Sequence, residues 1–281
     1  MPQAQIPQGT IHYTEQGTGE PIVLVHGLLT NSGLWRDVGP ELAKDFRVIA
    51  PDWPLGSHPE PMNEGTDFSP PGLAAIIAAF LEALDLRDVT LVGNDTGGAI
   101  CQLVAVNHAE RLGRLVLTPC DAYENFLPPV FKPLQWMARV PGSIWLMAQS
   151  LRADVLRRTV AYGMLAKRRL SADLTQPWGE PIQRDARIRG EVAAILRGID
   201  SRYTLDAAQR FGGFEKPVLL AWAPKDRYFK LEFAERLERD FANARLERIE
   251  DSATFVMVDQ PQRTAELISE FTRRPAGVAQ A

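Results

Sequence analysis

A carboxylate stands inside a glycine-rich turn. Residues 93–98 read GNDTGG and follow an apolar run at 89–92. Glycines on both sides of one residue allow a strand to turn sharply into a helix and expose the residue at the apex, here Asp95. The backbone N–H of Thr96 then lies at a helix N-terminus, where free amide donors stabilise negative charge. Asp95 is therefore a candidate nucleophile, and a simple helix cap is the alternative.

A second turn supplies a matching amide donor. In the stretch VLVHGLLTN an apolar strand ends at His26-Gly27, and the N–H of Leu28 follows. We predict that the N–H groups of Leu28 and Thr96 form an oxyanion hole beside Asp95. His26 is placed in the substrate pocket, although a hydrogen bond to the backbone is its other expected role. GNDTGG itself is not a dinucleotide fingerprint, because Asp95 occupies the second glycine position.

Strands and helices alternate along the chain and must position these turns. Such alternation predicts an α/β fold, with a mostly parallel central sheet and helices on both faces. The loops at the carboxyl ends of parallel strands gather on one rim, where sites are built. The expected strands are residues 21–26, 46–50, 89–92, 115–118, 217–222 and 245–249. The expected helices are residues 69–84, 97–108, 231–241 and 262–271.

The alternation breaks once. Residues 121–210 contain prolines and amphipathic pieces but no convincing strand, which predicts a helical cap between two core segments, 1–120 and 211–281. Apolar residues from Val155 to Met164 mark one helical stripe in this cap. The cap carries 14 Lys and Arg against 9 Asp and Glu, whereas the whole chain has a net charge of −4. A basic cap favours anionic substrates, and solvated helix faces are the alternative.

Composition limits the function classes. A net charge of −4 and the lack of a long apolar segment indicate no nucleic-acid partner and no membrane partner. No secretion signal is visible, and two cysteines fit a reducing cytoplasm. We expect a small-molecule substrate, no metal and no cofactor, while a homodimer is left open. The C-terminal stretch RRPAGVAQA is expected to be flexible.

With these features together, residues 9–272 resemble an α/β-hydrolase with a helical cap. Because the apex residue is an aspartate, the chain is similar to the branch that holds haloalkane dehalogenases and epoxide hydrolases. The resemblance implies that Asp95 attacks carbon and forms an ester, which activated water then hydrolyses. It also implies a second carboxylate, and Asp226 in LLAWAPKDRYF stands where the acid of the branch is expected.

The catalytic histidine of this branch is missing. The resemblance places it in a loop that reads IEDSATFVMVDQP here, and Thr254 occupies its position. A hydroxyl cannot replace imidazole as a general base near pH 7. His58, in the loop after the strand at 46–50, is our candidate for a replacement base, and a role in stabilising its own loop is the alternative. Asp121 and Glu124 are further carboxylates of the pocket rim, and the family sometimes places its acid there.

The substrate class stays open. Dehalogenases of this fold hold the halide with an aromatic N–H and often an Asn, but Thr96 and Leu28 occupy those positions. Epoxide hydrolases use two cap tyrosines, a role that Tyr162 and Tyr203 could fill. The cap tryptophans are expected to line an apolar pocket or to pack against the sheet, namely Trp136, Trp145 and Trp178.

Three functions therefore remain. The first is a hydrolase that acts on a small, largely apolar epoxide, ester or alkyl electrophile through Asp95, with a non-standard or missing base. The second is a lyase or isomerase on the same scaffold that uses Asp95 as a base. The third is a catalytically silent fold that binds a ligand. Since a binding protein has no need of a strained turn, the enzymatic functions are favoured and the first is our prediction.

Overall fold

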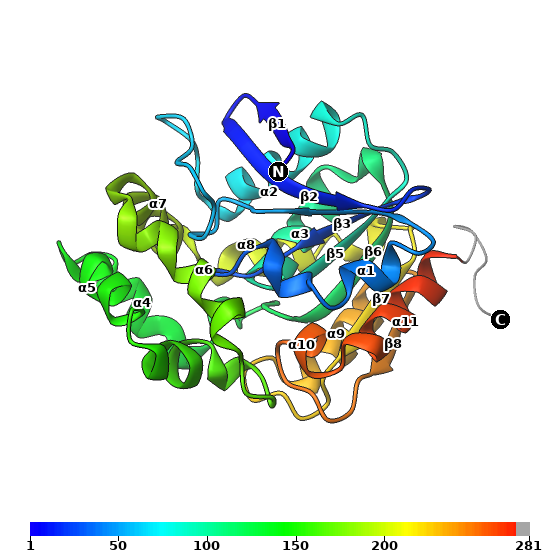
Figure 1. The fold of residues 1–281 in the computed structure, drawn as a ribbon. Helices are drawn as coiled ribbons and strands as arrows, with labels where there is room; N and C mark the ends of the chain where they lie inside the picture. Colours follow the sequence, from blue (N-terminus) through cyan, green and yellow to red (C-terminus); the bar gives the residue numbers. More distant parts are fainter. Residues whose placement is uncertain (274–281) are drawn as a thin grey trace.

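A single eight-stranded sheet forms the centre of the computed structural model, which describes residues 1–273 (Figure 1). The strand order is β1-β2-β4-β3-β5-β6-β7-β8. The strands are β1 (Gln3–Ile6), β2 (Gly9–Gln16), β3 (Pro21–Val25), β4 (Arg47–Pro51), β5 (Val89–Asp95), β6 (Leu112–Cys120), β7 (Val218–Trp222) and β8 (Ala244–Arg248). All six predicted strands are confirmed. The predicted flexible tail, apart from Arg273, lies outside the described residues.

The pairing of the strands divides the sheet into two parts. The neighbours from β4 through β3, β5, β6 and β7 to β8 are parallel. The strands β1 and β2 form an antiparallel edge that was not predicted. The side chains of β1 are alternately exposed and buried along its sequence QAQI. Over only four residues this alternation is too weak a signal to predict a strand.

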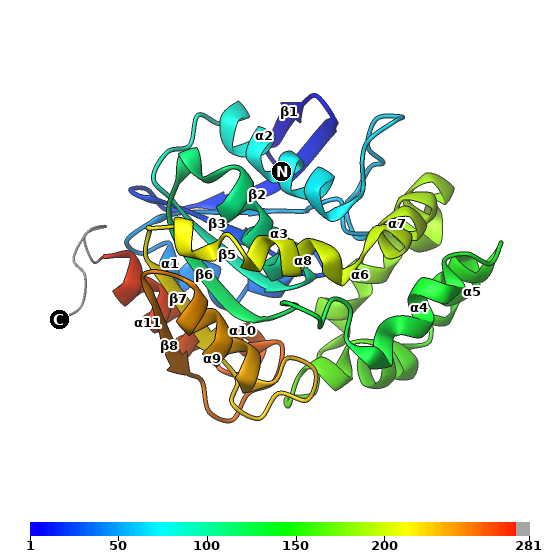
Figure 2. The ribbon, with the colours of Figure 1, turned by 180° about the vertical axis from the view of Figure 1, so that it is seen from behind.

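Helices cover both faces of the sheet, as predicted. One face packs against α2 (Pro70–Ala83), α3 (Thr96–Asn107) and α9 (Leu231–Asp240), which lie in front of the sheet in Figure 2. The opposite face packs against α1 (Gly39–Leu42), α10 (Val256–Asp259) and α11 (Pro261–Thr272). Successive residues of β3 enter the two cores in turn, because side chains alternate across a strand. The predicted parallel α/β architecture is confirmed.

Five α-helices and a π-helix lie between β6 and β7. They are α4 (Lys132–Met137), α5 (Ser143–Ser150), the π-helix η4 (Leu156–Ala161), α6 (Ala172–Arg184), α7 (Ala186–Gly198) and α8 (Ser201–Ala208). Figure 1 shows α4 to α7 as a layer at one side of the sheet. In contrast, α8 packs against α3 of the core. This inserted layer is named the cap below.

Hydrogen bonds join the cap to loops at the carboxyl ends of the strands. The Tyr162 hydroxyl donates to the carbonyl oxygen of Leu29 after β3, at 2.8 Å. The Ser57 hydroxyl, after β4, donates to the carbonyl oxygen of Trp178 at 2.6 Å. The cap therefore covers the rim on which a site was predicted. Within residues 1–273, no helix has the length and apolar character that crossing a bilayer requires.

Candidate active site

Asp95 lies at the apex of the turn from β5 to α3 with φ 54° and ψ −134°. Residues with a side chain rarely adopt this conformation, which costs about 1–3 kcal/mol. The Asp95 side chain makes no capping hydrogen bond to α3. The helix-cap alternative therefore has no support in the structure, and the turn holds the carboxylate at the rim for another reason.

The glycines of this turn allow a close approach of neighbouring segments. A Cβ atom on Gly97 would lie 2.3 Å from the carbonyl oxygen of His26, and a Cβ on Gly98 would lie 2.3 Å from the Cβ of Cys120. Both distances are well inside van der Waals contact. The sharp turn of GNDTGG therefore fits between β3 and β6 only with glycine at these two positions.

The carboxylate of Asp95 rests against the predicted oxyanion turn. A Cβ on Gly27 would lie 2.3 Å from Oδ2 of Asp95, so only a hydrogen fits there. The next residue, Leu28, has an N–H without a backbone hydrogen bond in the described part of the chain, while Leu29 N–H donates to Leu55. The structure thus brings Asp95, Leu28 and Thr96 together, as the sequence predicts.

His26 supports this turn from inside the protein and does not line a pocket. Its side chain is fully buried. Nε2 accepts a hydrogen bond from the N–H of Trp53 at 2.9 Å, which leaves Nδ1 to donate to the carbonyl oxygen of Gly27, also at 2.9 Å. Burial lowers the pKa of His26 to about 4, and these bonds hold a neutral ring. The predicted pocket role of His26 is wrong, because both nitrogens bind backbone.

Asp226 follows β7 and faces Thr254, the residue predicted to stand in the histidine position. Its Oδ1 accepts hydrogen bonds from the N–H groups of Tyr228 and Phe229, at 2.7 and 2.9 Å. The hydroxyl of Thr254 donates to Oδ2 at 2.8 Å. Burial nevertheless raises the pKa of Asp226. The relationship implied by the resemblance, an acid paired with position 254, is present with a hydroxyl in place of an imidazole.

The sequence analysis did not single out Asn94, yet its side chain connects the glycine-rich turn GNDTGG to the loop that carries Thr254. Its buried Nδ2 lies 2.8 Å from the carbonyl oxygen of Thr254 and 3.0 Å from that of Pro119. The only signal of this role in the sequence was an amide side chain within a turn of otherwise mostly small residues. Asn94 thereby fixes the loop that carries Thr254 next to the turn that carries Asp95.

Asp259 was also missed, and it joins the same loop to the cap. Its buried carboxylate accepts from the N–H groups of Lys167 and Arg168 in the cap, at 3.0 and 2.8 Å. The N–H of Ala253 donates to it at 2.9 Å. Three backbone donors satisfy one buried carboxylate, so the Thr254 loop and the cap are held as one unit.

Asp121 lies at the end of β6 in direct electrostatic contact with Asp95. Its side chain is fully buried, and neither oxygen has a hydrogen-bond partner among the described residues. Burial raises the pKa of Asp121 well above its ordinary value, the charge of Asp95 raises it further, and the nearby Thr96 side chain opposes the change. Burial and the neighbouring charge therefore both favour the neutral, protonated form of Asp121 over its anion.

Asp95 titrates near neutrality. Its side chain keeps partial contact with solvent. Burial raises the pKa of Asp95 to about 7, the Thr96 amide lowers it, and the charge of Asp226 raises it. Because each of these two carboxyls raises the energy of ionising the other, Asp95 and Asp121 titrate as a pair. No group of three or more metal-ligating side chains is found within residues 1–273.

A family model described as alpha/beta hydrolase fold matches residues 20–261. The chain belongs to the α/β-hydrolase-fold family. The chain is 30% identical over 271 residues to haloalkane dehalogenase 2 of Mycobacterium tuberculosis, with 94% of this chain and 91% of that protein covered. It is 26% identical to a cis-3-alkyl-4-alkyloxetan-2-one decarboxylase of Shewanella oneidensis, with 93% and 84% covered.

Solved structures of this α/β-hydrolase family show the same fold. An epoxide hydrolase superimposes with a TM-score of 0.80 at 20% identity, covering 96% of this chain and 97% of that chain. A putative ancestral haloalkane dehalogenase superimposes with a TM-score of 0.79 at 21% identity, covering 97% and 98%. The prediction of an α/β-fold hydrolase enzyme is confirmed at the level of the family.

The structure does not place His58 of this α/β-hydrolase at the nucleophile. His58 is buried, its Nε2 lies 2.7 Å from Oε2 of Glu191 in the cap, and Nδ1 accepts from the N–H of Gly56 at 3.4 Å. The other oxygen of Glu191 accepts from the N–H of Met62 at 2.8 Å. Because both ring nitrogens are engaged in joining the loop to the cap, the prediction of His58 as replacement base is wrong.

Two further predicted pocket residues lie at the surface. Glu124 is exposed and forms an ion pair with Arg236 at 3.1 Å. The hydroxyl of Tyr203 accepts from the exposed Arg202 at 2.9 Å. The ion pair holds the side chain of Glu124 in solvent, so its pocket prediction is wrong, whereas Tyr203 is half-buried against the core and its pocket role stays a prediction. Tyr162 is buried, but its hydroxyl donates to Leu29, so it supports the oxyanion turn.

Proposed function

We propose that the protein hydrolyses a small, largely apolar electrophile, an epoxide, an ester or an alkyl compound, through a covalent ester on Asp95. The observation that carries the proposal is the strained backbone of Asp95, which presses its carboxylate against Gly27. Strain of this kind persists where function requires it. The surrounding apolar cores and the cap favour an apolar substrate.

In the first step the ionised Asp95 attacks a carbon atom of the electrophile. A bond forms between Oδ and carbon while the bond to the leaving oxygen or halide breaks, and the leaving group takes the electron pair. An epoxide oxygen then needs a proton. Asp121 supplies it in our proposal, because its raised pKa keeps a proton on a carboxyl beside the nucleophile.

In the second step water attacks the ester carbonyl. The amides of Leu28 and Thr96 stabilise the negative oxygen of the tetrahedral intermediate. Once an epoxide has opened, Asp121 is ionised; it accepts the proton of the attacking water and returns this proton to the leaving oxygen as the acyl–oxygen bond breaks, so that the product leaves as an alcohol and Asp95 is regenerated as a carboxylate. A carboxylate replaces the imidazole of the family in this scheme, and we expect this step to be slow.

Accumulation of the ester tests the proposal. The protein is incubated with styrene oxide and with 1-bromobutane, and its intact mass is measured. We expect a mass increase equal to one substrate residue, located on the peptide that holds Asp95 and absent in Asp95→Asn. The matched variant Asp52→Asn, which changes a buried carboxylate elsewhere, should still form it. Absence of an adduct and of turnover, or an adduct that persists in Asp95→Asn, would contradict the proposal.

A lyase or isomerase that uses Asp95 as general base is the second candidate. A pKa of about 7 suits a base at neutral pH, and the histidine that would complete ester hydrolysis is replaced by Thr254. The Shewanella relative is a decarboxylase on a similar chain, which supports this candidate. Product analysis separates the two, since a hydrolase adds one water to its substrate and a lyase or isomerase adds none.

A further inference from the structure

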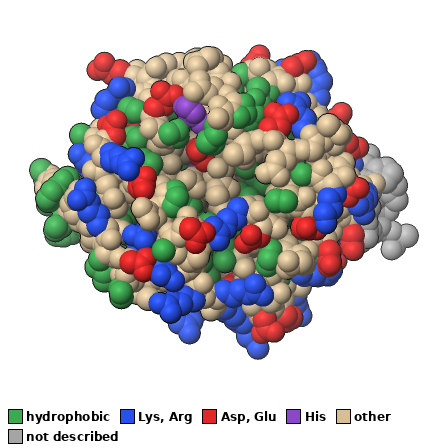
Figure 3. Space-filling model, viewed as in Figure 1, with side chains coloured by type: hydrophobic (Ala, Val, Ile, Leu, Met, Phe, Trp, Pro, Cys, Tyr) green, Lys and Arg blue, Asp and Glu red, His purple; other side chains and the backbone are tan. Residues whose placement is uncertain are grey.

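Exposed hydrophobic side chains of the described chain are concentrated in the cap. Eight of the ten large hydrophobic residues that are exposed lie between residues 130 and 160. Figure 3 shows hydrophobic side chains gathered at the edge where α4 and α5 lie in Figure 1, with Lys and Arg side chains beside them. We name the cap patch by its residues, Trp136, Val140, Trp145, Leu146, Val155, Leu156 and Val160.

The largest members of the cap patch lie on α4 and α5. Trp136 is 69% exposed, Trp145 is 52% exposed and Leu146 is 64% exposed. The sequence predicted that these tryptophans line an apolar pocket or pack against the sheet; packing against the sheet is wrong for both, since both are exposed, while Trp145 lines a surface cavity. The helix that carries Trp136 is nevertheless well fixed, because Gln135 donates to the carbonyl oxygens of Leu196 and Ile199 at 3.1 and 2.8 Å.

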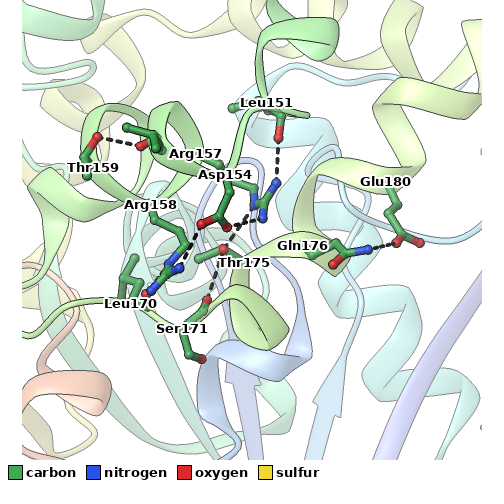
Figure 4. Close-up of polar contacts among 11 residues, drawn as sticks. Leu151, Asp154, Arg157, Arg158, Thr159, Leu170, Ser171, Thr175, Gln176 and Glu180 are labelled. Carbon is green, nitrogen blue, oxygen red and sulfur yellow. Dashed lines mark hydrogen bonds and ion pairs between the residues drawn. The ribbon is translucent and has the colours of Figure 1, made fainter.

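A network of hydrogen bonds and ion pairs fixes the π-helix, next to Val155 and Val160 of the patch; Figure 4 shows this network around Arg157 and Arg158. Arg157 is buried, and its guanidinium donates to Asp154, Leu151 and Thr175 at 2.8 to 3.1 Å. Arg158 donates to the other oxygen of Asp154 at 2.8 Å. The predicted apolar stripe of this segment is therefore held outward, with Val155 70% exposed and Val160 58% exposed. Exposed apolar side chains on a segment that such hydrogen bonds hold in place indicate a binding surface.

The segment that carries the patch is mostly basic. Residues 128–170 contain eight Lys and Arg but a single acidic residue, Asp154. Asp154 is already paired with Arg157 and Arg158. The exposed Arg139 and Arg152 form no ion pair among the described residues. The segment thus presents positive charge and apolar side chains together.

A surface cavity of about 340 Å³ adjoins the tryptophans of the patch. Trp145 and Arg139 line it from the α4–α5 side, and Arg189 and Arg197 line it from α7. No acidic residue lines this cavity. Three guanidinium groups beside an indole suit a phosphate group that is attached to an apolar chain.

We propose that the cap patch docks on an anionic lipid surface. Tryptophan is favoured at the boundary between headgroups and acyl chains, and arginines beside it pair with lipid phosphates. A second copy of this chain is a poor occupant, because a twofold interface would place the same basic surfaces against each other. The whole-chain charge of −4 predicted no membrane partner, but it conceals the basic segment of the cap.

Vesicle binding tests the proposal. Sedimentation with vesicles of phosphatidylglycerol and phosphatidylcholine at a 1:1 ratio, in low salt, should carry the protein down, and pure phosphatidylcholine vesicles should not. Arg139→Glu with Arg152→Glu should weaken binding by roughly 25-fold or more, from about fivefold for each basic residue removed. The control pair Arg87→Glu with Arg239→Glu makes the same charge change outside the cap and should bind nearly as the parent protein does.

The hydrophobic part of the patch is tested in the same assay. Trp136→Ala with Trp145→Ala should reduce binding to the mixed vesicles and remove the blue shift of tryptophan fluorescence that vesicles cause. Failure of the parent protein to bind mixed vesicles would overturn the proposal, as would equal losses in the cap and control pairs. A dimer in solution that the tryptophan variant converts to monomer would assign the patch to a second copy instead and overturn it.

Discussion

The hydroxyl of Thr254 donates a hydrogen bond to Oδ2 of Asp226, 2.8 Å away. In our proposal Thr254 stands where the family has its histidine, and this hydrogen bond joins it to Asp226, the proposed acid. The carboxylate of Asp226 is satisfied without an imidazole, by this hydroxyl and by two backbone N–H groups. Proton transfer at Asp95 consequently depends on the carboxyls around it.

The replacement of Thr254 by histidine should restore fast ester hydrolysis. Asn94 already fixes the backbone of residue 254 by a hydrogen bond to its carbonyl oxygen. A histidine side chain at this position can therefore form a hydrogen bond with Asp226, as the threonine hydroxyl does. In Thr254→His we expect the adduct on Asp95 to disappear and turnover to rise about 10²–10⁴-fold, the usual effect of a general base. Rapid-quench kinetics with intact-mass detection measures both.

The control for this substitution is Thr254→Ser, which keeps the hydroxyl and should keep the slow hydrolysis. Thr254 is fully buried, so circular dichroism and thermal unfolding must show that the histidine variant is folded. A folded Thr254→His protein that retains the adduct would contradict the assigned order of steps.

Asp95 should make both activity and stability depend on pH. Since the pKa of Asp95 is about 7 in the folded protein and about 3.9 in the unfolded chain, the folded state binds the extra proton between these values. The contribution of Asp95 to stability is therefore complete below pH 4 and is lost as the pH rises through 7. Activity should rise over the same pH range, because only the ionised carboxylate is a nucleophile.

Urea unfolding of Asp95→Asn and of the parent protein at several pH values measures this contribution. The stability advantage of the variant should grow by about 1–4 kcal/mol between pH 4 and pH 8. Other titrating groups are common to both proteins and cancel in the difference. A difference that stays constant with pH would show that Asp95 has an ordinary pKa.

His58 should contribute to stability and not to proton transfer. In His58→Gln the buried carboxylate of Glu191 loses its ring partner, and we expect the free energy of unfolding to fall by about 1–3 kcal/mol. The dependence of kcat on pH should keep its shape. His108→Gln, a change in a partly exposed ring elsewhere, serves as control. Loss of the rising limb of the pH profile in His58→Gln would restore the catalytic hypothesis.

Local signals in the sequence were sufficient to predict the parallel strands of the sheet, the glycine-rich turn at Asp95 and the turn that follows β3. Apolar runs followed by glycine turns depend on residues that are neighbours in the chain, so the turns that carry Leu28 and Asp95 could be located in the sequence, while the roles of Asp95, Leu28 and Thr96 stay predictions. The position of Thr254 opposite Asp226 followed from the resemblance. These predictions needed no knowledge of distant contacts.

The wrong predictions concern side chains whose partners are far away in the sequence. Glu191, the partner of His58, is 133 residues away, and Arg236, the partner of Glu124, is 112 residues away. Spacing carries no information on such pairs. Among the cap tryptophans, Trp178 is fully buried in the core, whereas Trp136 and Trp145 are exposed. An apolar side chain predicts burial against some surface but does not say whether that surface belongs to the same molecule.

A single turnover in water labelled with ¹⁸O tests the central claim, that Asp95 is the nucleophile, most directly. Excess enzyme is mixed with styrene oxide in H₂¹⁸O, and mass spectrometry is applied to the diol and to the peptide that holds Asp95. The account predicts ¹⁸O in the carboxylate of Asp95 and ¹⁶O in the newly formed alcohol, because water attacks the ester carbonyl. Label in the diol with an unlabelled Asp95 would mean that water attacks the substrate directly, and it would contradict the account.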